Sequence, residues 1–166
     1  MVRGPKEGAG TTLTETLVML AAVAILASAG AMLTIQVNRY FMSSTTRIDI
    51  QREARTVMYV ITRELRQAAA NSIVIDRANA NQPPFSKITF NKGSAAMTFQ
   101  QNCAKLEQIT GGRTQVLTKN LRFLAFSFPR SDELSIVSVS FTLSKPIYQG
   151  QTKTLHMVSE KVKVMN

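Results

Sequence analysis

Residues 16–38 have the sequence TLVMLAAVAILASAGAMLTIQVN, which contains no charged side chain. About 20 consecutive apolar residues are enough for a helix to cross the hydrocarbon core of a bilayer, so this stretch predicts one membrane-spanning helix. Arg3 and Lys6 precede it, and Arg39 and Arg47 follow it. The positive-inside rule favours a cytoplasmic N-terminus. We therefore expect a single-pass protein of the cytoplasmic (inner) membrane, with the chain after this stretch on the extracytoplasmic side.

Three kinds of segment share this pattern. An uncleaved anchor keeps the helix, a secretory signal peptide is cut after it, and a third kind of leader is cut before it. Ala27-Ser28-Ala29 matches the small-residue cleavage site of a secretory signal. Glu15 favours the third kind, because an acid at the start of a membrane helix is costly and is a functional candidate for that reason. The structural alternative is a capping box, in which Thr12 and Glu15 satisfy free amides at the helix start.

The sequence GAGTTLTETLV, residues 8–18, resembles the leader and mature start of type IV pilins and type II secretion pseudopilins. In that family a short basic leader ends in Gly, and the fifth residue of the mature chain is Glu. The resemblance implies that a prepilin peptidase cuts between Gly10 and Thr11 and methylates the amino group of Thr11. It also implies that Glu15 pairs with the amino terminus of a neighbouring subunit during assembly. Such pairing is favourable because two unpaired charges in lipid are costly.

Two further patterns follow the apolar stretch. Residues 46–70 carry apolar side chains at steps of three and four, typical of an amphipathic helix, and we expect one helix from about residue 13 to 70. From about residue 72 the apolar pattern alternates between breakers, which predicts strands. The expected strands are 72–76, 87–91, 96–101, 104–109, 114–118, 121–128, 134–143 and 155–164. Gly111-Gly112 is expected to form a hairpin turn.

A long helix followed by antiparallel strands gives an α+β fold. The expected fold is pilin-like: one long N-terminal helix, membrane-spanning in its first half and amphipathic in its second, packed on an antiparallel β-sheet domain. The corresponding segments are a leader (1–10), a transmembrane and assembly helix (11–39), the amphipathic half of the helix (40–70) and a β-rich extracytoplasmic domain (71–166).

A weaker resemblance points to minor pilins of the W type and J-type minor pseudopilins. It rests on several short phrases spread over the chain, which favour a minor subunit over the main building block of a filament. The phrases are REAR at 52–55, RELRQA at 63–68, KITF at 87–90, GGRTQVL at 111–117 and NLRFLAF at 120–126.

The chain is basic, with a formal net charge of +10. Residues 71–166 contain twelve Lys and Arg against five Asp and Glu. A basic domain is compatible with nucleic acid, anionic lipid or acidic partners. The positive residues are scattered along the sequence, however, which is typical of a solvated surface.

Few residues are candidates for chemistry. The single Cys103 excludes an intramolecular disulfide, and in an oxidising compartment it is either a buried free thiol or an intermolecular link. The single His156 has no evident carboxylate to orient it. Asp132 and Glu133 are more typical of a turn than of a calcium site. Phosphate loops, dinucleotide motifs and zinc spacings are absent from the sequence. We expect no enzyme activity, no catalytic residue, no cofactor and no metal.

The sequence therefore predicts a minor pilin or pseudopilin that is processed, held in the cytoplasmic membrane and then assembled into a type IV pilus or type II secretion pseudopilus. The expected partners are other subunits, the prepilin peptidase, the inner-membrane assembly machinery and lipid, with DNA more weakly supported. Two alternatives stay open. One is a secreted or membrane-tethered binding domain with a Sec signal cut near Ala29, and the other is a minor pilin for DNA uptake.

Overall fold

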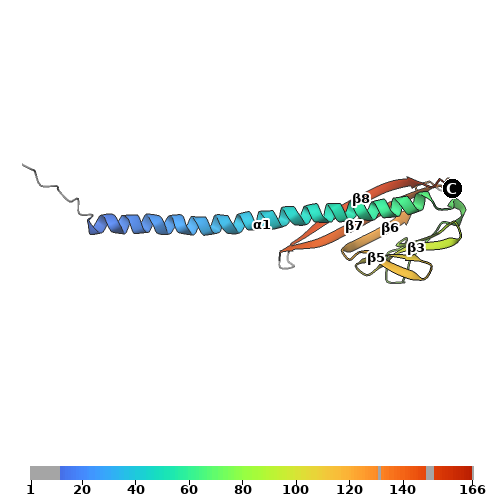
Figure 1. Cartoon of the computed structure of the whole chain (residues 1–166), viewed down its shortest axis with the longest axis horizontal. Helices are drawn as coiled ribbons and strands as arrows, with labels where there is room; N and C mark the ends of the chain where they lie inside the picture. The colour runs from blue at the N-terminus through green and yellow to red at the C-terminus, as the bar shows by residue number, and fades with distance from the viewer. Residues whose placement is uncertain (1–11, 131, 149–151, 166) are drawn as a thin grey trace, which may run out of the picture. The chain divides into compact units, whose positions relative to one another are not determined.

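The computed structural model describes residues 12–130, 132–148 and 152–165. It contains one long helix packed on antiparallel β-sheets, so the predicted α+β class is confirmed (Figure 1). The helices in the described part are α1 (Leu13–Arg66) and a short 3₁₀ helix, η1 (Ala70–Ser72). The strands there are β1 (Val74–Asp76), β2 (Lys87–Lys92), β3 (Ala95–Asn102), β4 (Lys105–Thr110), β5 (Arg113–Thr118), β6 (Leu121–Ser127), β7 (Ile136–Tyr148) and β8 (Thr152–Lys163).

The described strands form two antiparallel sheets. A five-stranded sheet has the order β1-β2-β3-β4-β5, and a three-stranded sheet has the order β6-β7-β8. Each strand pairs with the next in the chain within its sheet, so short turns make the connections. Gly111 and Gly112 join β4 to β5 with φ angles of 55° and 80°. Two positive φ angles match the backbone of a tight hairpin turn, and the predicted hairpin is confirmed.

The contacts within the chain divide it between Phe41 and Met42. We call the second unit, from Met42 onward, the β domain. It holds one hydrophobic core, to which α1 contributes a stripe at steps of three and four residues, as the amphipathic pattern predicts. The buried residues of this stripe are Ile50, Ala54, Val57, Met58, Ile61 and Leu65. Alternating strand positions supply the facing side, including Phe90, Phe99, Phe126 and Phe141, each fully buried.

The C-terminus of α1 differs from the prediction. The helix ends at Arg66 rather than near residue 70, although three alanines follow. The amide of Ala69 instead donates to the carbonyl of Asn91 at 3.0 Å, and the Ser72 hydroxyl accepts from the amide of Asn91 at 2.9 Å. These bonds to β2 replace the next helical turn, so tertiary contacts override the helix propensity of alanine.

Strand β7 is longer than predicted, because it continues through Pro146 to Tyr148. The predicted strand, residues 134–143, ends before this proline. Within the described residues, pairing of β7 with β6 stops at Leu143, whereas pairing with β8 continues to Tyr148. Pro146 therefore lies where β7 has a partner on one side only, and a proline without an amide hydrogen is tolerated at such a position.

Candidate functional site

The first described part of α1 exposes apolar side chains all round. From Leu13 to Met42 every side chain is exposed. Exposed fractions include 63% for Leu17, 72% for Leu26 and 61% for Leu33. Covering one such leucine is worth about 1.5–3 kcal/mol, so this surface requires lipid or other protein around it.

This part of α1 is long and apolar enough to cross a membrane. An 18-residue window in α1 has a mean hydropathy of 2.3, and none of that window is buried inside the protein. Length and composition support single-pass anchoring, although a secretory signal has the same properties.

The hydroxyl groups within this segment are bonded along the helix itself. The Ser28 hydroxyl donates to the Ile25 carbonyl at 2.8 Å, and the Thr34 hydroxyl donates to the Gly30 carbonyl at 2.9 Å. Near the start of α1, the Thr16 hydroxyl bonds the Leu13 carbonyl at 2.8 Å. In hydrocarbon each unsatisfied polar group is costly, so these local bonds make Ser and Thr compatible with a membrane-spanning helix.

Glu15 lies in the first turn of α1. Its amide donates to the backbone carbonyl of Thr12 at 3.0 Å, while the Thr12 hydroxyl bonds the Thr14 hydroxyl at 3.0 Å. Among the described residues, no side-chain bond of a capping box joins Thr12 and Glu15. The position still suits an acid, since the N-terminal turn of a helix carries partial positive charge. The carboxylate of Glu15 is exposed.

The predicted processing site lies outside the described residues, since both Gly10 and Thr11 precede residue 12. Cleavage after Gly10 and methylation of Thr11 therefore stay predictions. The alternative cut near Ala29 lies in the described part, where α1 continues without a break from Leu13 to Arg66.

Two acidic side chains of α1 bind the five-stranded sheet and the turn that follows it. The carboxylate of Glu53 accepts from the Thr118 hydroxyl at 2.5 Å and from Nδ2 of Asn120 at 2.9 Å. The carboxylate of Glu64 accepts from Nζ of Lys92 at 2.5 Å and from Nη2 of Arg63 at 2.7 Å.

The amphipathic pattern of residues 46–70 does not predict these anchors, because Glu53 and Glu64 lie outside its apolar stripe. Glu64 is in fact only 3% exposed. Burial tends to raise the pKa of its carboxyl group, but the hydrogen bonds and charges of Lys92 and Arg63 outweigh burial and hold that pKa below its ordinary value. The Glu64 carboxylate in turn raises the pKa of the Arg63 guanidinium. No signal in the sequence links Glu64 to Lys92, which follows it by 28 positions.

The remaining candidates lie apart from one another in the fold. Cys103 is an exposed free cysteine in the turn after β3, with a φ of 52°. Of the two alternatives for this residue, the buried thiol is therefore wrong, and the intermolecular link stays a prediction. His156 lies in β8, opposite Leu143 of β7. Glu133 accepts from the Ser135 hydroxyl at 2.9 Å and lies 3.9 Å from the Arg130 guanidinium, so its contacts stay within the loop before β7.

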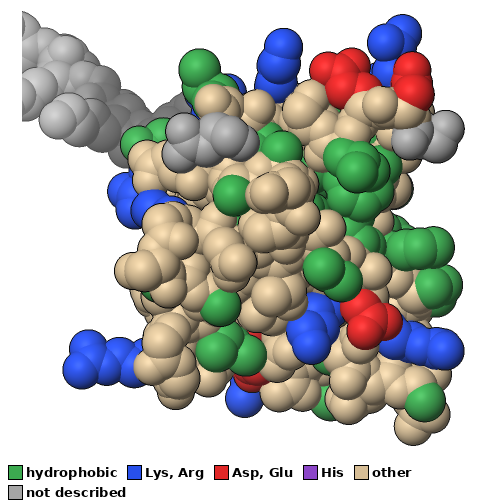
Figure 2. Space-filling view, turned by 90° about the vertical axis from the view of Figure 1, so that its right-hand side faces the viewer, with side chains coloured by type: hydrophobic (Ala, Val, Ile, Leu, Met, Phe, Trp, Pro, Cys, Tyr) green, Lys and Arg blue, Asp and Glu red, His purple; other side chains and the backbone are tan. Residues whose placement is uncertain are grey.

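The basic residues of the β domain are scattered along its sequence. Figure 2 shows one end of the protein, where Lys and Arg side chains stand singly around the outline rather than in one patch. A continuous basic stripe is the usual footprint of a nucleic-acid-binding face, and this face lacks one.

Compared with family models, curated proteins and solved structures, the chain matches none of them.

Proposed function

We propose that this protein is a minor pilin or pseudopilin, a structural subunit that is assembled into a type IV pilus or a type II secretion pseudopilus. One observation carries the proposal. Glu15 occupies the first turn of a helix whose next 23 residues are uncharged and exposed, and the same helix then packs on antiparallel sheets. A membrane anchor or secretory signal needs the apolar residues but not the acid.

In this proposal the apolar segment has two successive environments. The processed subunit first lies in the cytoplasmic membrane, and assembly machinery then moves it into a filament in which helices cover one another. The charge of Glu15 is the feature of this segment that the two environments affect most. In lipid its charge is costly. Pairing with the free amino group of Thr11 in a neighbouring subunit would remove much of that cost and fix the position of the incoming subunit.

The alternative of a Sec signal cut near Ala29 is less well supported. Such a cut would fall within the continuous α1 and would remove the acid that distinguishes this segment. It would also leave Met32, Leu33 and Ile35, each more than half exposed, on a secreted protein.

The N-terminus of the mature protein tests the proposal directly. We expect mass spectrometry of the protein purified from its native membrane to give Thr11 as the first residue, with a methylated amino group. A mature chain that starts at Gly30 would support the secreted domain and overturn the proposal. An uncut chain that starts at Met1 would support a plain anchor and overturn it as well.

Replacing Glu15 tests the role of its charge. We expect Glu15→Gln to be cut and inserted like the parent protein but to fail in filament assembly, because the side chain keeps its size and loses its charge. Thr14→Ser is the matched control in the same helical turn and should assemble normally. Normal assembly of the Glu15→Gln protein would contradict the role proposed for the carboxylate.

A further inference from the structure

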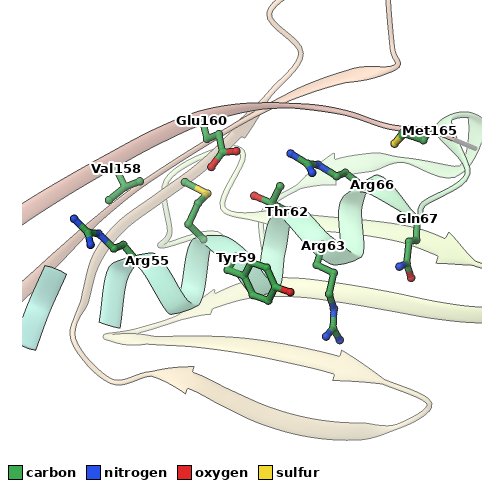
Figure 3. A pocket seen from close by; sticks show the side chains of 10 residues that line it. Arg55, Tyr59, Thr62, Arg63, Arg66, Gln67, Val158, Glu160 and Met165 are labelled. Carbon is green, nitrogen blue, oxygen red and sulfur yellow. The ribbon is translucent and has the colours of Figure 1, made fainter. Parts of the chain in front are cut away.

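A groove of about 780 Å³ lies between α1 and β8 in the β domain (Figure 3). Met58 of α1 and Val158 of β8 form an apolar part of its lining. Arg55 and Arg66 reach it from α1, and Glu160 reaches it from β8. This groove plays no part in the proposed assembly role of Glu15, so the inference below does not depend on that role.

The groove carries two arginines that have no acidic partner. Within the described residues, neither Arg55 nor Arg66 forms a salt bridge, and both are exposed. The neighbouring Arg63 differs, because it is already bound to Glu64 at 2.7 Å. Guanidinium groups bind carboxylates through paired hydrogen bonds, so Arg55 and Arg66 together favour a ligand with two carboxylates.

Thr62 supplies a second, independent observation. It lines the groove between the two arginines and is only 7% exposed, yet its Oγ1 has no hydrogen-bond partner in the described part of the chain. Threonine in a helix commonly bonds the carbonyl four residues earlier, as Thr56 does with Arg52 at 3.0 Å. A buried hydroxyl without a partner is costly, and a ligand in the groove would satisfy it.

Strand β8 gives the groove an open side. In the described sheet β8 is an edge strand, paired with β7 alone. Edge strands present free backbone amides and carbonyls to an added segment. An extended peptide alongside β8 could therefore place alternate side chains in the groove.

We propose that the groove between α1 and β8 binds an acidic peptide segment of another protein, in which carboxylates alternate with apolar side chains. The carboxylates contact Arg55 and Arg66, one of them accepts the hydrogen bond of the Thr62 hydroxyl, and an apolar side chain packs on the half-buried Val158. A second copy of this chain fits less well, because its own charge is +10. Nucleic acid fits less well too, because part of the lining is apolar and suits the apolar side chains of a peptide.

The test uses the full chain in nanodiscs of neutral lipid and a short fluorescent peptide of alternating Glu and Val. The matching Gln and Val peptide measures binding without charge. We expect saturable binding of the acidic peptide at physiological salt, seen as a rise in fluorescence anisotropy. Reversing both arginines, Arg55→Glu with Arg66→Glu, should weaken binding about tenfold or more, since two charge-assisted contacts are lost.

Two further variants separate binding from folding. Lys105→Glu with Arg122→Glu makes the same charge change at exposed positions outside the groove and should leave affinity within about twofold. Thr62→Val removes the unpaired hydroxyl, so it should leave the melting temperature of the free protein unchanged or higher while weakening peptide binding about fivefold. A purely structural role for Thr62 would not produce that combination.

Several results would overturn the proposal. These are the absence of saturable binding, equal binding of the neutral peptide, and equal losses in the groove and control double variants. Competition by a single-stranded oligonucleotide that is lost in the same groove variants would assign the groove to nucleic acid instead.

Discussion

Glu64 keeps an ionised carboxylate in a nearly closed environment. Its side chain is 4% exposed, whereas those of its partners Arg63 and Lys92 are 57% and 34% exposed. A buried charge is tolerated only where hydrogen bonds and opposite charges compensate the loss of water. The two cations thus reach inward from solvent to hold an acid of α1 against the end of β2.

Removing Lys92 should therefore weaken the β domain. We predict that Lys92→Met lowers the free energy of unfolding by about 1–3 kcal/mol at neutral pH, because the buried carboxylate loses its contact with that ammonium group. Urea unfolding of the purified protein in neutral detergent, followed by circular dichroism, measures the difference. Lys105→Met, at an exposed position of β4, is the control and should cost little. Equal stability of the two variants would contradict the anchoring role of Lys92.

The same contact predicts a pH dependence with a definite sign. The folded-state pKa of Glu64 lies below the value in the unfolded chain, which is about 4.3 for a free glutamate. Ionised Glu64 therefore stabilises the fold at pH values above its pKa in the unfolded chain. This contribution disappears as the pH falls through the lower pKa of the folded state. In Lys92→Met the folded-state pKa of Glu64 should rise. The free energy of unfolding should therefore fall less between neutral and acidic pH than it does in the parent protein.

At the scale of elements, Gly30 lies in open space on α1. A Cβ built on it would meet no atom within 4 Å, so the fold of the single chain does not require glycine there. Small residues precede it at Ala21, Ala22, Ala24, Ala27 and Ala29, and small residues allow close approach of helices within a membrane or filament. Glycine in a helix otherwise costs about 1 kcal/mol relative to alanine.

We predict that Gly30→Leu separates folding from assembly. The β domain should keep the melting temperature of the parent protein, because a Cβ at residue 30 would meet no atom within 4 Å. Filament yield should fall, because a bulky side chain blocks close helix packing. Gly30→Ala is the matched control and should assemble. Filament yield is measured by shearing and immunoblotting, and full assembly of the Leu variant would show that the small residues are not needed.

The elements differ in how far sequence could predict them. Strands such as β2 and β3 are recognisable because their side chains alternate between core and solvent, and α1 because its apolar steps match a helical period. β5 does not alternate, since its first four residues are all exposed, and it is recognisable only from the Gly111-Gly112 turn before it. The end of α1 and the length of β7 are not recognisable, since both depend on partners distant in the chain. These partners are Asn91 for the helix end, and the start of β6 at Leu121, which leaves β7 unpaired with β6 beyond Leu143, for the strand around Pro146. The groove was hidden for the same reason, because its walls, α1 and β8, are joined only by tertiary structure.

At the scale of the whole molecule, the chain divides between Phe41 and Met42 into an exposed apolar segment and a domain with a buried core. Residues 12–42 bury no side chain within the protein, whereas the core extends from Ile50 to Val164. The Asp49–Lys145 pair, at 3.2 Å, and the bond from the Met165 amide to the Arg66 carbonyl fix the two ends of the amphipathic helix to the β7–β8 hairpin. Every stabilising contact of the core that the structure describes is thus made after Met42.

Deleting residues 1–41 should consequently leave a folded, water-soluble β domain. We predict one cooperative thermal transition within about 4 °C of the full-length protein in detergent, a difference that corresponds to roughly 1 kcal/mol. A shorter chain that starts at Glu53 is the control: it loses the fully buried Ile50 and the Asp49–Lys145 pair, and its melting temperature should be clearly lower. Aggregation of the chain that starts at Met42, or the absence of a cooperative transition, would mean that the apolar segment is needed for folding. It would then have to be described as part of the core and not as a surface for lipid or for neighbouring subunits.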